Sequence, residues 1–194
     1  MIRGAVRSSM RTFLTCVLTV LLLAAACGDG APADPGLRAE LLEMLRQDQE
    51  IRTPGADETE WDRVERANTQ RMHAILDEHG WPGYALVGED GEDAAWALVQ
   101  HADRDLELQR RALGLLRAAV AEGDASPGNL AYLEDRVRVA EGKPQRYGTQ
   151  WQVDRDGEWQ PRTPIEDEAG VDARRAEAGL QPLEEYLKEL KAME

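Results

Sequence analysis

An apolar stripe with helical spacing, interrupted by one carboxylate, begins the part of this chain that can form a core. Successive residues of an α-helix turn by about 100°, which brings one set of side chains to a single face over residues 37–52: Leu37, Leu41, Met44, Leu45 and Ile51. Asp48 falls in the middle of this face, and Arg52 follows one turn later. Because burying a carboxylate is costly unless it is paired or hydrogen-bonded, the pattern predicts a packed helix with an internal polar partner for Asp48.

Helical periodicity returns in most of the following segments. We expect further helices over residues 59–79, 94–102, 106–121, 130–141, 172–178 and 182–193, with loops over 88–93 and 123–129. Thr59 and Asp172 are expected to cap two of these helices. Residues 149–153 and 158–160 flank an Asp-Gly turn, which is typical of a hairpin. The predicted fold is mainly α, a single compact array of about five to seven helices with a short β-hairpin near 149–160.

The N-terminal segment has the pattern of an export signal. Three arginines precede an apolar stretch over residues 13–23 that is too short for a stable membrane span. The small residues before Cys27 resemble the lipobox of bacterial lipoproteins, although Ala24 stands where a leucine is usual. We predict a signal peptide over 1–26, lipidation at Cys27, a flexible tether over 27–36 and a helical domain over 37–194. The alternative is an ordinary signal peptide cleaved near Ala26.

Cysteine usage favours the lipoprotein interpretation. The chain has two cysteines, and Cys16 lies inside the segment that export would remove. An exported protein that keeps Cys27 alone has no disulfide partner for it, whereas lipidation explains a single cysteine at the new N-terminus. Two or three acyl chains give stable anchoring where one would be marginal. We therefore expect a cell-envelope protein that contacts a membrane through its lipidated N-terminus.

The charge of the chain excludes one class of partner. Lysine and arginine number 23 against 37 aspartates and glutamates, a net charge of −14. Loss of residues 1–26 would remove three arginines and no acid, which leaves a net charge near −17. Such a surface repels the phosphate backbone, so no nucleic-acid partner is expected.

Polar side chains at core-facing positions in several segments predict a pocket for a small polar ligand or an envelope component. Asp48, His101 and Asp135 are expected to accept hydrogen bonds or charge, and Arg52 and Arg136 to pair with acids. Gln145, Tyr147 and Gln150 would line the rim. The predicted ligand-binding set is Asp48, Arg52, Asn68, His101, Asp135, Arg136, Gln145, Tyr147 and Gln150. The sequence does not identify a cofactor.

Two alternatives use the same residues differently. In the first, the protein is an acid–base or metal-assisted hydrolase, with His101, Asp48 and Asp135 as the catalytic candidates. The sequence has no HExxH motif and no second well-placed histidine, so no metal ligand is assigned. A Gly-x-Ser-x-Gly motif is also absent. In the second alternative, the protein is an interaction scaffold and its polar network is purely structural.

Several short segments resemble, as an ordered set, a family of bacterial proteins of unknown function. The resemblance covers roughly residues 37–187 and rests on DQEIR, HGWPG, AAWALVQHADRD, LAYLEDRV, GKPQRYGTQ, PIED and VDARR. The family has no assigned activity, and its members occur with and without export signals. The resemblance implies importance for the motif positions Asp48, Arg52, Gln100, His101, Asp135, Arg136, Gln145, Tyr147, Gly148, Thr149 and Gln150, and implies no substrate.

Overall fold

A computed structural model describes residues 31–53, 55 and 57–192, so the predicted signal peptide and Cys27 lie outside the described residues. Within those ranges the chain forms seven α-helices, one 3-10 helix and a two-stranded antiparallel sheet. The elements are α1 (Pro35–Ile51), α2 (Glu58–His79), α3 (Tyr84–His101), α4 (Leu106–Ala121), α5 (Pro127–Ala140), β1 (Trp151–Val153), β2 (Trp159–Pro161), η1 (Glu168–Gly170), α6 (Val171–Glu177) and α7 (Leu183–Ala192). The predicted fold class is confirmed.

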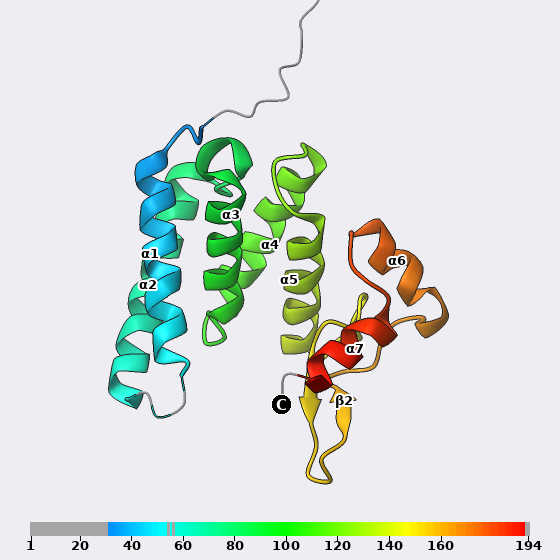
Figure 1. The fold of residues 1–194 in the computed structure, drawn as a ribbon. Helices are drawn as coiled ribbons and strands as arrows, with labels where there is room; N and C mark the ends of the chain where they lie inside the picture. The colour runs from blue at the N-terminus through cyan, green and yellow to red at the C-terminus, as the bar shows by residue number, and fades with distance from the viewer. Residues whose placement is uncertain (1–30, 54, 56, 193–194) are drawn as a thin grey trace, which may run out of the picture.

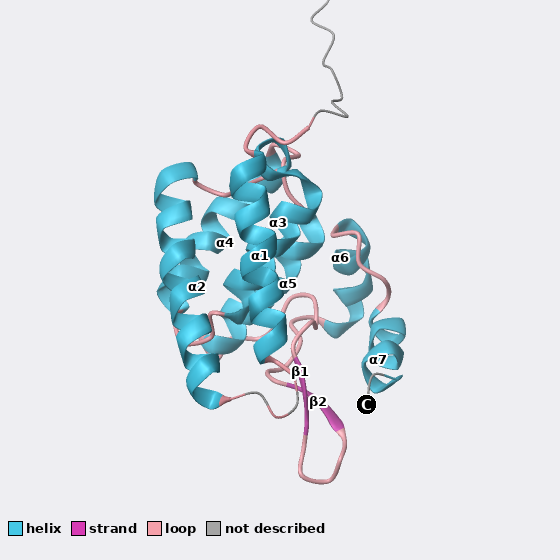
Figure 2. Ribbon diagram, turned by 60° about the vertical axis from the view of Figure 1, so that its left-hand side comes forward, coloured by secondary structure: helices cyan, strands magenta, loops and turns pink. Residues whose placement is uncertain are grey.

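Helices α1 to α5 form a bundle, and the C-terminal elements lie beside α5, away from α1 and α2 (Figure 1). α1 packs mainly against α3, and α4 packs mainly against α5. The bundle buries a continuous apolar core whose innermost members include Leu41, Met72, Ile75, Val87, Leu98, Leu108, Leu116 and Leu133. The hairpin extends beyond the bundle at the end where α1 and α3 finish (Figure 2). No helix among the described residues is long and apolar enough to cross a membrane.

The predicted loop over 88–93 is wrong, because α3 begins at Tyr84 and continues through this segment with a single kink. Gly88 forms the kink, with φ 76° and ψ 171°, a backbone conformation that glycine adopts readily. The acidic residues after it are tied to neighbouring helices. Asp90 pairs with Arg38 of α1, and Glu92 is fully buried, where it accepts from the Trp81 indole N–H at 3.1 Å. Residues 88–93 were predicted as a loop from their polar composition, but they form part of α3.

Helix starts also differ from the predicted caps. Asp57, not Thr59, caps α2 by accepting hydrogen bonds from the backbone N–H groups of residues 59 and 60. α5 begins at Pro127 behind a Ser126 cap, three residues before its predicted start, since proline at the first helical position has no N–H to satisfy. Asp172 lies inside α6 and accepts from the backbone N–H of Leu183, so it anchors the start of α7 instead of capping its own helix.

The predicted hairpin is confirmed, and an isolated β-bridge lies beside it. Gln152 faces Gln160 in the antiparallel register, and the Asp-Gly turn joins the two strands. Beside it, Gln145 forms a bridge with Ile165, which holds the segment after α5 against the segment after β2. The loop over residues 144–150, which follows α5, lies at the same end of the molecule as the last turns of α1 and α3 (Figure 2).

Candidate functional site

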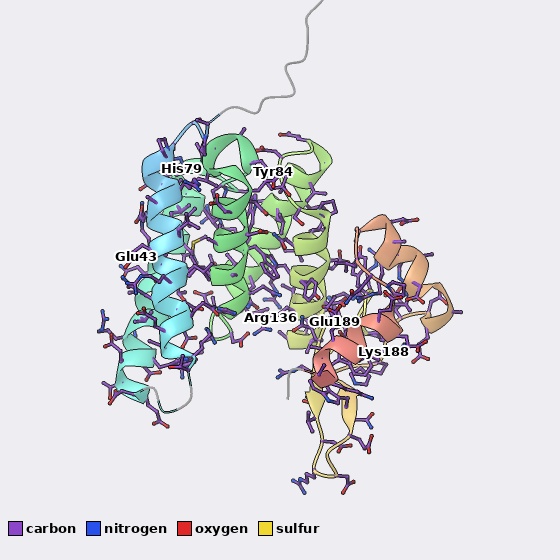
Figure 3. All side chains as sticks on the ribbon, in the orientation of Figure 1. Glu43, His79, Tyr84, Arg136, Lys188 and Glu189 are labelled. Atoms are coloured by element: carbon purple, nitrogen blue, oxygen red, sulfur yellow. The ribbon has the colours of Figure 1, made fainter. Side chains whose placement is uncertain are left out.

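The segment from the end of α3 to the start of α4, His101–Asp105, connects to three other helices and is called the α3–α4 turn below. Each of its four polar side chains has a different partner. His101 contacts Asp48 of α1, Asp103 pairs with Arg136 of α5, Arg104 pairs with Asp62 of α2, and Asp105 contacts His73 of α2. Figure 3 shows Arg136 extending from α5 toward the end of α3. Polar groups from separate helices therefore meet at this turn, and three of them, Asp48, His101 and Arg136, belong to the predicted ligand-binding set.

Asp48 is buried, with 2% of its surface exposed, and its carboxylate has two cationic or potentially cationic partners. Arg52 donates from Nε and Nη2 at 2.9 and 3.0 Å, and Nδ1 of His101 lies 2.6 Å from Oδ2. Arg52 was the predicted partner. Burial opposes ionisation of Asp48, but the hydrogen bonds from His101 and Arg52 outweigh it, so the pKa of this carboxyl is lowered. The charge on Asp48 is thus stable inside the protein.

His101 is oriented by this contact. An ionised carboxylate only accepts hydrogen bonds, so Nδ1 carries a proton and Nε2 of the neutral ring is an acceptor. The His101 side chain is 27% exposed, and no described residue lies within hydrogen-bonding distance of Nε2. The pair therefore has the arrangement in which a carboxylate fixes the tautomer of a histidine and leaves its second nitrogen available.

Arg52 also lines a cleft of about 670 Å³, which we call the Trp61 cleft. The guanidinium groups of Arg52 and Arg104 lie over the Trp61 ring, 5.8 and 4.9 Å from its centroid. The remaining described lining comes from the end of α1, the α1–α2 connection and the first turns of α2: Ile51, Thr53, Gly55, Glu58 and Asp62. The cleft falls within the range of volumes typical for small-molecule sites.

The Trp61 cleft was not predicted as a site. In the sequence, Trp61 looks like an ordinary apolar residue on the inner face of a helix, and Arg104 and Asp62 look like ordinary surface charges. One indication of this cleft was present in the sequence: Arg52 lies beside the apolar stripe that contains Asp48, and in the structure Arg52 lines the cleft. Asn68, by contrast, was predicted as a site residue, but its amide donates to the carbonyl of Met44 at 3.5 Å and not to Asp48.

Asp135 is fully buried and organises the loop over residues 144–150. Its carboxylate accepts from the backbone N–H groups of Arg146, Tyr147 and Thr149 at 2.6, 3.2 and 3.0 Å. Burial raises the pKa of Asp135 in spite of these backbone hydrogen bonds. Asp135 therefore fixes the backbone of this loop against α5.

The other polar residues of this loop are also engaged by the fold. Gln145 is fully buried, donating to the carbonyls of Gln150 and Thr163 and accepting from the Gln150 N–H. Gly148 has φ 65°, and a Cβ there would lie 2.8 Å from Ile165, so only glycine fits this position. Arg175 of α6 donates to the Tyr147 carbonyl at 2.8 Å.

Gln150 connects the two regions. Its amide oxygen accepts from Nη1 of Arg136 at 3.1 Å, and its amide nitrogen donates to the Thr149 hydroxyl, which in turn donates to Asp135. Arg136 also pairs with Asp103. A continuous hydrogen-bonded path therefore runs from the buried loop to the α3–α4 turn. The predicted ligand-binding residues divide into a partly exposed group around Arg52 and His101 and a buried group around Asp135.

The geometry does not assemble a metal site among residues 31–53, 55 and 57–192. No three histidine, cysteine, aspartate or glutamate side chains in those ranges are grouped so that they could hold an ion. His73 contacts Asp105 at 2.8 Å, and His79 lies at the opposite end of the bundle (Figure 3).

Comparison with known proteins identifies the family. The model of a family of unknown function, DUF6624, matches residues 35–193. The chain belongs to this family. The match begins where α1 begins and covers every helix and strand described above. The resemblance to a family of unknown function is confirmed, and the individual motifs stay a prediction. No curated protein and no solved structure matches the chain.

The buried charge on Asp48 makes a prediction about stability. Asp48→Asn should lower the free energy of unfolding by about 2 kcal/mol at pH 7, because an amide cannot serve both Arg52 and His101 as a carboxylate does. Folding lowers the pKa of Asp48, so the contribution of its ionised carboxylate to the free energy of unfolding is fully present above the unfolded pKa near 3.8. This contribution is lost as the pH falls through the folded pKa. Urea unfolding between pH 3 and pH 7 measures this.

The matched control is Asp90→Asn, which removes an exposed partner of Arg38 and should have a much smaller effect at every pH. A difference between wild type and Asp48→Asn that stays constant down to pH 3 would contradict the assignment of the effect to the ionised carboxylate.

Proposed function

We propose that this DUF6624 domain binds a small polar ligand with a hydrogen-bond-accepting or anionic group in the Trp61 cleft, and that the domain is carried by an exported lipoprotein. The observation that carries the binding proposal is the position of Arg52. One edge of its guanidinium is held by Asp48, which His101 also contacts, and the same side chain lines the cleft. A side chain fixed in this way loses little freedom when a ligand binds.

The donors that remain support an accepting ligand. Nη1 of Arg52 has no hydrogen-bond partner among the described residues, and neither do Nε and Nη2 of Arg104. Arginine presents planar, paired donors that match carboxylate and phosphate groups. Trp61 adds a flat apolar wall beneath the two guanidinium groups. Glu58 and Asp62 also line the cleft and would disfavour ligands that carry several negative charges.

Arg52→Gln should weaken binding while leaving the fold intact. Succinate and inorganic phosphate serve as probes, with the emission of Trp61 as the readout, assigned by comparison with Trp61→Phe. We expect the apparent affinity of the responding probe to fall by about tenfold or more, because one charge-assisted hydrogen bond is lost. Native mass measurement of the purified full-length chain would show in addition whether a ligand co-purifies.

The control is Arg46→Gln, which changes an exposed arginine of the same helix that pairs with Glu43 and Glu50 outside the cleft. Equal binding by Arg52→Gln and Arg46→Gln would overturn the proposal. So would the absence of both a co-purifying ligand and any probe response.

A second candidate function rests on the Asp48–His101 contact. With Nδ1 held by the carboxylate, Nε2 of His101 can accept a proton from water or from a substrate, which is the role of a general base. The nucleophile would be water. Ser126, the only serine downstream of the predicted signal peptide, caps α5 and is engaged there.

His101→Asn separates this function from simple binding. The Asn amide can still donate to Asp48, but it offers nothing in place of Nε2, so hydrolysis of p-nitrophenyl acetate or p-nitrophenyl phosphate should fall by about 100-fold or more. His79→Asn, at the other end of the bundle, should leave any turnover unchanged. Turnover that is absent in the wild type, or equal in the two variants, would exclude acid–base catalysis by His101 on these probes.

The lipoprotein part of the proposal rests on residues 1–36 of the sequence. Cys27 follows three alanines at the end of the apolar segment, and it is the one cysteine that export would leave in the chain. Acyl chains on this residue would hold the acidic domain at a membrane of the cell envelope.

Cys27→Ser should abolish fatty-acid labelling and release the protein from the membrane fraction. Labelling with an alkyne fatty acid in a bacterial host, followed by fractionation, measures both. Cys16→Ser is the matched control, since it changes a cysteine of the same segment that the predicted processing discards. Labelled, membrane-bound Cys27→Ser protein would refute lipidation at this position.

A further inference from the structure

A second cleft, of about 550 Å³, lies next to the Trp61 cleft and shares Asp62 and Arg104 with it. It follows the surface of α2 and is closed on one side by the α3–α4 turn, so we call it the α2 groove. The α2 side chains that line it recur at helical spacing from Asp62 through Glu65, Thr69 and Gln70 to His73. A helix rises about 1.5 Å per residue, which makes this stripe about 16 Å long.

Glu65 is the unusual member of the α2 groove. Only 6% of its surface is exposed, and Oε2 is buried without a hydrogen-bond partner. The nearest cation is Arg104, whose Nη1 lies 3.6 Å from Oε2 and is committed to Asp62 at 2.7 Å. Buried carboxylate oxygens in folded proteins are almost always hydrogen-bonded, and leaving one without a donor is costly. The groove therefore contains an acceptor that lacks a donor.

Negative charge occurs at both ends of the α2 groove. Asp62 and Glu65 lie at the start of the stripe, and Asp105 lies at the far end beside His73. Between the two ends the lining consists of the uncharged Thr69 and Gln70 and the cationic Arg66. The chain as a whole carries a net charge of −14, which attracts cations over a longer range. A metal ion does not match this lining, because the described carboxylates are not grouped to ligate one.

We propose that the α2 groove binds a linear polyamine, an extended organic cation with ammonium groups separated by aliphatic segments. One ammonium group donates to Glu65, a second approaches Asp105, and the aliphatic part lies across Thr69 and Gln70. The occupant supplies the hydrogen bond that Glu65 lacks, at the cost of displacing the long contact from Arg104. Because Arg104 also lies 4.9 Å from the Trp61 ring centroid, its displacement is expected to change Trp61 emission.

The experiment is a calorimetric titration of the purified full-length chain with spermidine at constant ionic strength. Pentylamine is the monovalent control probe and magnesium chloride the inorganic one. Spermidine should bind with a defined stoichiometry of one and more tightly than either control, because only spermidine reaches both acidic ends. Equal binding of all three probes would indicate a general attraction to an acidic surface and would overturn the proposal, as would no binding of spermidine.

Three substitutions on α2 test the assignment of the site. Glu65→Gln should weaken spermidine by about tenfold, through loss of one charge-assisted hydrogen bond. Arg66→Gln should strengthen it by about two- to fivefold, because Arg66 lines the groove, has no ion pair among the described residues and repels a cation. Glu60→Gln, an exposed partner of Arg63 outside the groove, should change nothing.

Asp62→Asn is a second test of the site, which stays informative if Glu65→Gln fails to fold. Asp62 is half exposed at its side chain, so its loss should not disturb the core, yet it frees Arg104 to occupy Glu65. Spermidine should therefore bind more weakly to Asp62→Asn as well. Wild-type affinity in both Glu65→Gln and Asp62→Asn would place the polyamine elsewhere and refute the α2 groove as its site.

Discussion

The burial of the Asp48 charge determines how this end of the bundle is built. A carboxylate with 2% exposure requires donors from more than one direction, and the α1 segment supplies Arg52 and the neighbouring Gln49. The second direction comes from His101, which fixes the end of α3 against α1. Once α3 ends there, the α3–α4 turn must follow, and its remaining side chains reach α2 and α5. The polar cluster is therefore a consequence of one buried charge placed near a helix end.

Asp135 shows a different solution to the same problem. It too is fully buried, but its donors are mainly backbone N–H groups of one loop, supplemented by a threonine hydroxyl. Backbone donors cannot move away without unfolding the loop, and they leave no side chain free for a ligand. Asp48 is held instead by side chains, among them Arg52 and His101, which are 29% and 27% exposed. The first arrangement closes a site, whereas the second leaves functional groups at the surface.

Much of the architecture follows from periodicity, and the failures have physical causes. The interruption of the α1 stripe predicted both the burial of Asp48 and its pairing with Arg52. The α3 start was missed because Glu92, which reads as a loop residue, is stabilised inside the core by Trp81 and Asn129. A single sequence gives no indication that a tryptophan N–H and an amide from another helix will meet that carboxylate. Local composition cannot report partners that the fold brings together.

The same argument explains why the candidate site was only half predicted. Asp48 was selected because it stands at an apolar position, where a polar residue needs a reason. Arg52 was selected because it follows Asp48 by one turn, and His101 because it is a polar residue at the end of a predicted helix. Trp61 and Arg104 follow the expected pattern, an aromatic on an inner face and a cation in a turn, so nothing in the sequence distinguishes them. The structure places Arg104 over Trp61 and beside Asp62 and Glu65, where it forms part of both clefts. An occupant that moves this side chain in one cleft alters the charge lining the other, so the two clefts are coupled through one exposed arginine.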